Sequence, residues 1–202
     1  MPAGPKARRT RAQLIEAATR VFAEQGFQNT AVAQIAEHAG VSLGTFYQYF
    51  RNRDEVLAAM VGDSLRGMET DTGAGWRVAD GVEGLTRIFG IYVDAYTRSI
   101  DIVRVWENVS QTEPAMIAIR KAAAHTITNQ FATELRRASK AGEIRAMTAR
   151  EAMLTARALA GMADRVCFEM FAFDPPEPAA TKDEVAQLLA TLWAGALGLE
   201  TE

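Results

Sequence analysis

The sequence contains one cysteine and two histidines among 202 residues. A single cysteine excludes an internal disulfide and a metal site built from several thiolates. The histidines, His38 and His125, stand in neither the Glu-x-x-His nor the His-Glu-x-x-His spacing of metal-binding helices. We also find no glycine-rich phosphate loop and no nucleophile-elbow motif. These absences argue against an enzyme and predict that the protein needs no cofactor or metal.

Long hydrophobic runs are also missing. No window approaches the ~18 to 20 consecutive apolar residues of a transmembrane helix. The basic, polar start, Met1 to Arg11, is not followed by the apolar region of a secretory signal. We therefore expect a cytoplasmic protein with no membrane partner.

The net charge of −3 conceals an asymmetry. Residues 1–53 carry seven Lys/Arg against three acidic residues, so this end has a charge of +4 and the remainder −7. A basic segment on an acidic protein is typical of a surface that meets a polyanion, although basic ends are often only solvated.

Helix signals dominate what the sequence does contain. Five pairs have the spacing of a capping box, in which a short polar residue is followed three positions later by Glu or Gln: Thr10/Gln13, Asn52/Glu55, Asp80/Glu83, Thr148/Glu151 and Thr181/Glu184. Gly26, Gly142 and Gly198 follow apolar-periodic runs, as expected of helix ends. The pattern predicts nine helices, over residues 10–25, 30–38, 42–49, 53–70, 81–99, 101–111, 114–141, 148–171 and 182–197.

We expect an all-α, nine-helix bundle with two domains. An N-terminal arm and three-helix module would occupy residues 1–52, and a C-terminal helical core residues 53–202, with the helix at 53–70 connecting them. Residues 70–80, which include Gly73 and Gly75, are interpreted as a flexible joint.

The N-terminal module has the pattern of a helix-turn-helix. Thr30 is placed to cap the second helix, and Gly40, Val41 and Ser42 supply a short turn and a cap for the third. On the third helix Phe46 and Phe50 share one face. The opposite face is small and polar: Gly44 and Gln48, flanked by Thr45 and Tyr47. Glycine in a helix costs ~1 kcal/mol relative to alanine. We therefore interpret Gly44 as a position where the helix backbone approaches a groove closely, and not as a surface glycine without a role.

These residues carry a family resemblance. The run from Val41 to Glu55 resembles the helix-turn-helix signature of the tetracycline-repressor (TetR) family, and residues 10–60 match it without a gap. The other matching positions are Gly26, Phe27, Thr30, Val32, Ile35, Ala36, Ala39 and Gly40. Nine helices in about 200 residues also fit that family, although the C-terminal two-thirds match only in architecture.

The resemblance implies a DNA-binding role for particular side chains. Ser42, Thr45, Tyr47 and Tyr49 would contact DNA from the recognition helix, and Thr30 would bond a phosphate. Arg53 stands where the family has a phosphate-neutralising lysine. We expect Arg8, Arg9 and Arg11 to add affinity as an arm, and Gln48 to read adenine. Leu43 stands where the family often has a lysine. Its position around the helix is close to the inward face, which favours packing against the protein over contact with a thymine methyl.

The C-terminal helices are rich in aromatic residues, which in most helical proteins form a packed core. By resemblance they would enclose a pocket for an apolar or amphipathic effector. The predicted lining is Phe89, Tyr92, Tyr96, Trp106, Asn108, Phe131, Ala160, Asp164 and Phe168. The last helix has a broad apolar stripe that must be covered. The resemblance implies a homodimer in which the helices at 148–171 and 182–197 form a four-helix bundle with those of the partner, with Leu188, Leu192, Trp193 and Ala196 at the interface.

We therefore expect a repressor that binds an inverted-repeat, double-stranded DNA operator as a homodimer. A small-molecule effector would release it by shifting the helix at 53–70. Two alternatives stay open: a DNA-binding regulator with no small-molecule ligand, and an all-α enzyme.

Overall fold

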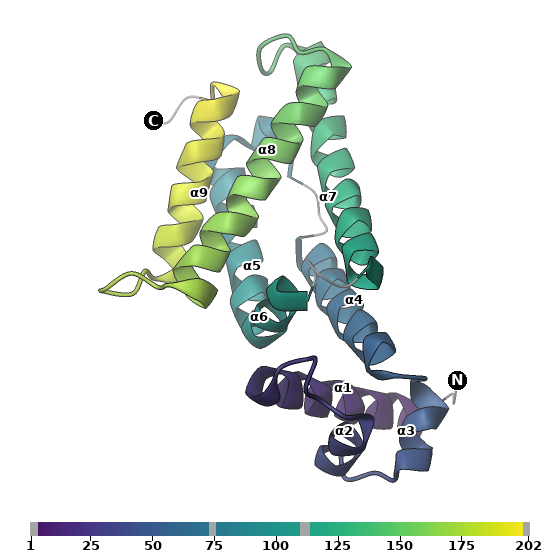
Figure 1. The fold of residues 1–202 in the computed structure, drawn as a ribbon. Helices are drawn as coiled ribbons and strands as arrows, with labels where there is room; N and C mark the ends of the chain where they lie inside the picture. The colour runs from purple at the N-terminus through teal and green to yellow at the C-terminus, as the bar shows by residue number, and fades with distance from the viewer. Residues whose placement is uncertain (1–3, 73–75, 110–113, 200–202) are drawn as a thin grey trace. The chain divides into compact units, whose positions relative to one another are not determined.

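The computed structural model describes residues 4–72, 76–109 and 114–199, with side chains at all of these positions except 65–72, 108, 114, 115 and 123. Throughout these ranges the regular structure is helical, which confirms the predicted all-α class (Figure 1). The elements are α1 (Pro5–Gln25), α2 (Val32–His38), α3 (Leu43–Tyr49), α4 (Arg53–Thr72), the 3-10 segment η1 (Val78–Asp80), α5 (Gly81–Arg98), α6 (Ile100–Val109), α7 (Pro114–Ala141), α8 (Ala149–Phe168), the π-helical turn η2 (Glu169–Phe173) and α9 (Lys182–Leu197). Within the described residues, no helix is long and apolar enough to cross a membrane.

The first helix begins earlier than its sequence pattern predicted. α1 starts at Pro5, whose missing N–H costs nothing at the first helical position. Thr10, expected to cap the helix, therefore lies within it, and its hydroxyl donates to the carbonyl of Lys6 at 3.2 Å. The basic residues expected in an arm, Arg8, Arg9 and Arg11, are residues of α1.

Two of the predicted capping boxes form completely, and two others do not because an acidic side chain of the pair accepts a different backbone N–H. Thr148 and Thr181 make complete boxes at α8 and α9. At α4, Asn52 accepts the N–H of Glu55 at 2.9 Å, but the Glu55 carboxylate accepts the N–H of Arg51 at 2.7 Å. The box predicted at Asp80 is absent, because its carboxylate accepts the backbone N–H of Arg77 at 3.1 Å.

The chain forms two compact units that do not follow chain order. Unit 1 comprises residues 1–66 and 101–120, and unit 2 comprises residues 67–100 and 121–202. Both α4 and α7 contribute residues to each unit. The domain boundary between residues 52 and 53 stays a prediction. Gly73 and Gly75 lie outside the described residues, and Trp76 and Val78, at the far end of the expected joint, are buried.

Unit 1 is built on one apolar core. Leu14 and Phe22 of α1, Ile35 of α2 and Phe46 of α3 are at most 2% exposed and belong to a single cluster. Leu57 and Met60 of α4 extend that cluster, with Val105 and Val109 of α6. The short helices α2 and α3 therefore owe their stability to burial, since isolated helices of seven residues are not stable in water.

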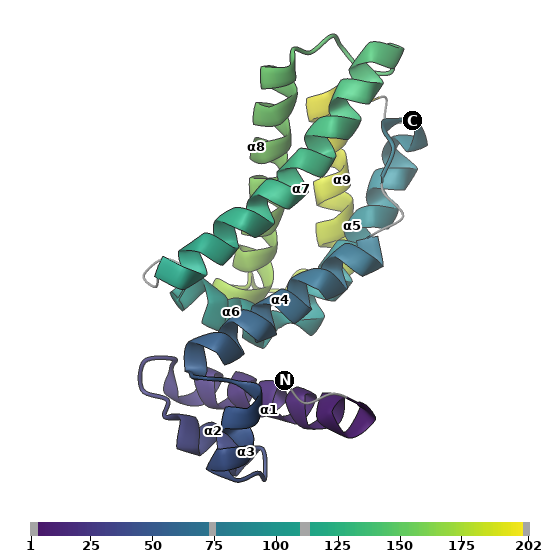
Figure 2. The ribbon, with the colours of Figure 1, turned by 90° about the vertical axis from the view of Figure 1, so that its right-hand side faces the viewer.

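Unit 2 is organised around Trp193 of α9. α5 and α9 make the most extensive helix pair and run alongside each other in both views (Figures 1 and 2). The Trp193 ring has edge-on contacts with Phe131 and Phe89, at centroid distances of 4.8 and 5.1 Å, and a further one with Trp76 at 6.1 Å. Aromatic pairs in this geometry add to the apolar burial that holds the unit together.

A buried carboxylate, Glu134 of α7, joins η1 to α7. It accepts the backbone N–H of Val78 at 2.9 Å and two donors of Arg137 at 2.7 and 2.8 Å, and Arg77 pairs with it at 3.2 Å. Burial alone would raise the pKa of Glu134, but the hydrogen bonds from Arg137 and Val78 outweigh that effect and lower it. The Arg137 guanidinium also lowers the pKa of Glu143 through hydrogen bonds.

We predict that replacing Glu134 by Gln destabilises unit 2 by about 1–3 kcal/mol at neutral pH, because Arg77 loses this carboxylate partner and Arg137 keeps only Glu143. The folded-state pKa of Glu134 is lowered, so its stabilisation is present above the unfolded carboxyl value, ~4.3, and is lost as pH falls toward the folded value. Urea unfolding between pH 7 and pH 3 measures this. The variant should lose less stability on acidification than the wild type.

The matched control is Glu177→Gln, in the exposed loop before α9. It should leave both the neutral stability and the acid dependence unchanged. If Glu134→Gln has the same acid dependence as the wild type, the network is not the source of the effect.

Candidate DNA-binding surface

The turn between α2 and α3 has the predicted geometry. Gly40 adopts a positive φ of 66°, which L side chains rarely do, and the N–H of Val41 returns to the carbonyl of Ala36 at 3.0 Å. Ser42 caps α3, since its hydroxyl oxygen accepts the N–H of Thr45 at 3.1 Å. The same oxygen lies 2.9 Å from the Thr45 hydroxyl.

α3 is divided into an inner and an outer face. Phe46 is fully buried and Phe50, directly after the helix, is 1% exposed. The Tyr47 ring is 54% exposed, yet it rests edge-on against Phe46 at 5.6 Å, so its orientation is supported from beneath. Gly44 and Gln48 are exposed with it. The structure thus gathers Gly44, Tyr47 and Gln48 on one outward face, beside the exposed Ser42 and the half-buried Thr45. Tyr49, also expected to meet DNA, is half-buried and packs against the core of unit 1.

Two neighbouring residues differ from expectation. Thr30 is 3% exposed and its hydroxyl donates to the carbonyl of Gly26 at 2.9 Å, while Ala31 occupies the N-cap of α2. The hydroxyl therefore faces the loop that closes α1. Leu43, expected to pack inward, is 45% exposed, because α3 begins at that residue and its side chain projects beyond the core.

Two arginines assigned to phosphate contacts are engaged by the protein itself. Arg11 pairs with Asp63 of α4 at 2.6 Å. Arg53 donates to carbonyls of the loop between α1 and α2. Lys6, Arg8 and Arg9 are exposed on α1. Exposed basic side chains of this kind supply salt-dependent attraction to a polyanion.

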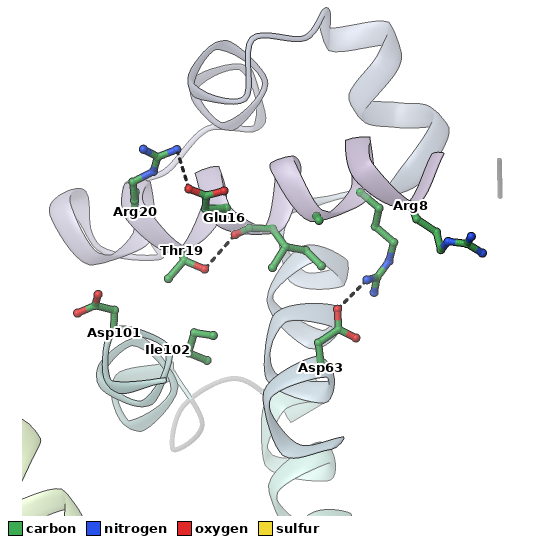
Figure 3. Close-up of a pocket in the computed structure, with 10 residues that line it drawn as sticks. Arg8, Glu16, Thr19, Arg20, Asp63, Asp101 and Ile102 are labelled. Atoms are coloured by element: carbon green, nitrogen blue, oxygen red, sulfur yellow. Dashed lines mark hydrogen bonds and ion pairs between the residues drawn. The ribbon is translucent and has the colours of Figure 1, made fainter. Parts of the chain in front are cut away.

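A hollow of about 570 Å³ lies in unit 1 between α1, α4 and α6 (Figure 3). Figure 3 shows Glu16 and Thr19 of α1 on one side of it and Asp63, Asp101 and Ile102 of α4 and α6 on the other. A second hollow of about 330 Å³ lies against the end of α1 and α6. Neither is lined by residues predicted to contact an effector.

The predicted effector residues do not form one group. Trp106 packs on the core of unit 1, whereas Phe89 and Phe131 contact Trp193 in unit 2. The side chain of Asn108 lies outside the described residues. Phe168 stacks on Phe173 at 5.8 Å, and Ala160 is half-buried on α8.

A smaller group does come together in unit 2. Tyr92 and Tyr96 of α5 have ring centroids 5.8 Å apart. Desolvation raises the pKa of Tyr92 well above its usual value, and the charge of Asp164 on α8 raises it further. Burial, with a smaller contribution from Asp164, raises the pKa of the Cys167 thiol to about 12. Cys167 is therefore a poor nucleophile at neutral pH.

The last helix buries one face and exposes another. Trp193, expected at a dimer contact, is 2% exposed within its own chain. Leu188 and Leu192 are 43% and 42% exposed on the outer face of α9, and Ala196 is exposed there too. On α8, Leu154 and Met153 are 54% and 37% exposed. These two residues were not among the predicted interface residues, although Leu154 begins a series with Ala158 and Gly161 at helical spacing.

The first helices of unit 1 match a known protein family. Residues 14–60, which span most of α1 through the first part of α4, match the model of the bacterial regulatory proteins of the tetR family. The regulator HbdR of Aromatoleum is 40% identical over 76 residues, covering 38% of this chain and 31% of that protein. TtgR of Pseudomonas putida is 48% identical over 60 residues, covering 30% and 28%. The matched segment is thus less than a third of either relative.

The similarity of folds extends further than the similarity of sequences. The structure of a protein of Syntrophomonas wolfei, assigned to the TetR family of transcriptional regulators, superimposes with a TM-score of 0.77. The superposition covers 95% of this chain and 96% of that one at 13% identity, so it is evidence of fold alone. The N-terminal module, residues 14–60, is thus a domain of the tetR family of bacterial regulatory proteins.

Proposed function

We propose that the protein is a DNA-binding transcriptional regulator and, more specifically, a repressor that binds an inverted-repeat operator as a homodimer. One observation carries the proposal: the outer face of α3 presents Gly44, Tyr47 and Gln48 to solvent while Phe46 holds the helix from within. The family match of residues 14–60 and the names of the relatives, HTH-type transcriptional regulators, support it.

The chemistry of this face suits a DNA groove. The amide of Gln48 can bond N6 and N7 of adenine together, which makes it the best candidate for base recognition. Tyr47, Thr45 and Tyr49 carry hydroxyl groups suited to phosphate oxygens. Gly44 would let the helix backbone approach the groove closely. Arg8 and Arg9 would contribute affinity without sequence preference.

Gly44 and Tyr47 allow a direct test on a duplex selected from random sequences by the wild type. A Cβ at position 44 would contact only the Ser42 Oγ, at 3.8 Å, so Gly44→Ala fits and should stabilise α3 by up to about 1 kcal/mol. The same methyl should weaken operator binding because it stands on the recognition face. Tyr47→Ala should weaken binding at least about tenfold.

Gly90→Ala is the matched control, since a Cβ at that position of α5 meets nothing within 4 Å. It should gain stability without affecting DNA binding. Unchanged operator affinity in both Gly44→Ala and Tyr47→Ala would contradict the assignment of this surface.

We propose the homodimer on the basis of the exposed apolar residues of α8 and α9. Leu188 and Leu192 lie on α9 and Leu154 on α8, helices that contact each other within unit 2. An apolar surface of this kind is the usual signature of an interface. Two half-sites on one duplex require two copies of the recognition helix, which an isologous dimer supplies.

Leu192→Asp should convert the dimer to a monomer at micromolar concentration, because association would bury an unpaired carboxylate at a cost of several kcal/mol. Sedimentation velocity measures the mass. Ala124→Asp, which places the same charge at an exposed position of α7, should remain dimeric. A monomeric wild type would refute the dimer.

We also propose that a small apolar or amphipathic effector binds unit 2 and lowers operator affinity. The support is the group formed by Tyr92 and Tyr96 of α5, whose ring centroids lie 5.8 Å apart, and Asp164 of α8, whose charge adds to the desolvation that raises the pKa of Tyr92. Such a mixture of aromatic walls and a few polar groups is typical of ligand sites. A hundredfold loss of DNA affinity requires ~2.7 kcal/mol of coupling, which is within the usual allosteric range.

The test is a thermal-shift screen followed by operator release. Compounds that act through this group should shift the melting temperature of the wild type, release the operator and lose at least part of both effects in Tyr92→Phe. Trp76→Phe, in the separate cluster on Trp193, is the control and should keep both responses. If compounds bind but leave operator affinity unchanged, the alternative of a regulator without an effector is favoured.

A further inference from the structure

The loop between α1 and α2, residues 26–31, has carbonyl groups that no helix satisfies. Gly26 ends α1 with a φ of 80°, and its carbonyl accepts the Thr30 hydroxyl at 2.9 Å. The Phe27 carbonyl accepts the N–H of Thr30 at 3.3 Å. α2 begins directly after the loop, with Ala31 as its N-cap. The position of α2 therefore depends on how the remaining carbonyls of this loop are held.

One side chain from a distant part of the chain holds them. Nη1 of Arg53, the first residue of α4, donates to the carbonyls of Phe27, Gln28 and Thr30 at 2.9, 2.8 and 3.2 Å. Nη2 donates to the Gln28 side-chain oxygen at 3.1 Å. The guanidinium carbon lies 4.7 Å from the centre of the Phe27 ring, in cation-π contact.

We propose that Arg53 is a positioning residue for operator binding: it locks the loop at 26–31, and through it the start of α2, against the start of α4. The inference rests on the proposed DNA-binding function. It departs from the expectation that Arg53 neutralises a phosphate, because the Nη donors already serve the loop.

Arginine suits this role in a way that lysine does not. Its planar fork donates from two nitrogens in fixed directions and stacks on an aromatic ring, whereas a lysine ammonium is a compact charge on a flexible stem. At a phosphate contact either residue supplies one positive charge. Arg53→Lys therefore separates the two roles, since it keeps the charge but loses the fork and the stacking on Phe27.

The first measurement needs no DNA. Hydrogen exchange of the full-length chain is compared among the wild type, Arg53→Lys and Arg53→Gln. Both variants should exchange the amides of Thr30 and Ala31 about tenfold faster, the equivalent of one charge-assisted hydrogen bond lost. Arg51→Gln is the control: that side chain is 88% exposed and pairs with Glu55, so the loop should keep its protection. Unchanged exchange in Arg53→Lys and Arg53→Gln overturns the proposal.

The second measurement is operator affinity as a function of salt, on a duplex selected by the wild type. Arg53→Lys and Arg53→Gln should both weaken binding about tenfold, with the wild-type salt slope retained in each. A phosphate contact predicts instead that Arg53→Lys binds like the wild type and that Arg53→Gln lowers the slope by about 0.9. That second pattern overturns the positioning role. A wild type that selects no duplex would contradict the proposed function, while the exchange experiment would still decide whether Arg53 holds the loop.

Discussion

The surface proposed to meet DNA depends on the burial of two phenylalanines beneath α3. A helix of seven residues is not stable alone in water, so α3 exists because Phe46 and Phe50 pack into the core formed with α1 and α2. Full burial of each ring is worth about 1.5–3 kcal/mol. Because side chains four apart lie on the same helix face, fixing Phe46 and Phe50 inward turns Gly44 and Gln48 outward. The same packing orients Tyr47, whose ring rests on Phe46.

Electrostatic contacts then set the geometry around this core. Arg11 joins α1 to Asp63 of α4, and Arg53 joins the start of α4 to the loop before α2. In both cases a basic residue that counts toward the positive charge of the N-terminal end also holds helices together. The net charge of a segment therefore overstates the number of cations that a DNA backbone would meet. The exposed side chains of Lys6, Arg8 and Arg9 are better placed for that role.

Sequence periodicity predicted the helices well, because apolar spacing and capping boxes such as Thr148/Glu151 act over a single turn. It was wrong at Thr10 and Asp80, where the same spacing occurs inside a helix or where another backbone N–H lies closer. Such competition is decided by local geometry, which spacing alone does not specify.

The candidate site was predictable where it follows from the local helical repeat, and not where it depends on tertiary contacts. The opposite faces of α3 follow from the helical repeat, and the exposure of Tyr47 agrees with it. Burial of Thr30 and capture of Arg53 by the Gln28 carbonyl depend on residues brought together by the tertiary fold, so no local pattern indicates them. The same holds for the last helix, whose apolar stripe is wide enough to cover two faces. The sequence does not indicate which residues are buried within the chain, whereas in the structure Trp193 is buried and Leu192 is exposed.

The central claim is that the outer face of α3 is where this protein meets DNA. It is tested most directly by hydrogen exchange of the full-length protein with and without a duplex that it has selected. The account predicts slower exchange on binding over α3 and the residues that flank it, 40–53, with unit 2 changed little by direct contact. Protection concentrated in α8 and α9, with none at residues 40–53, would contradict the account.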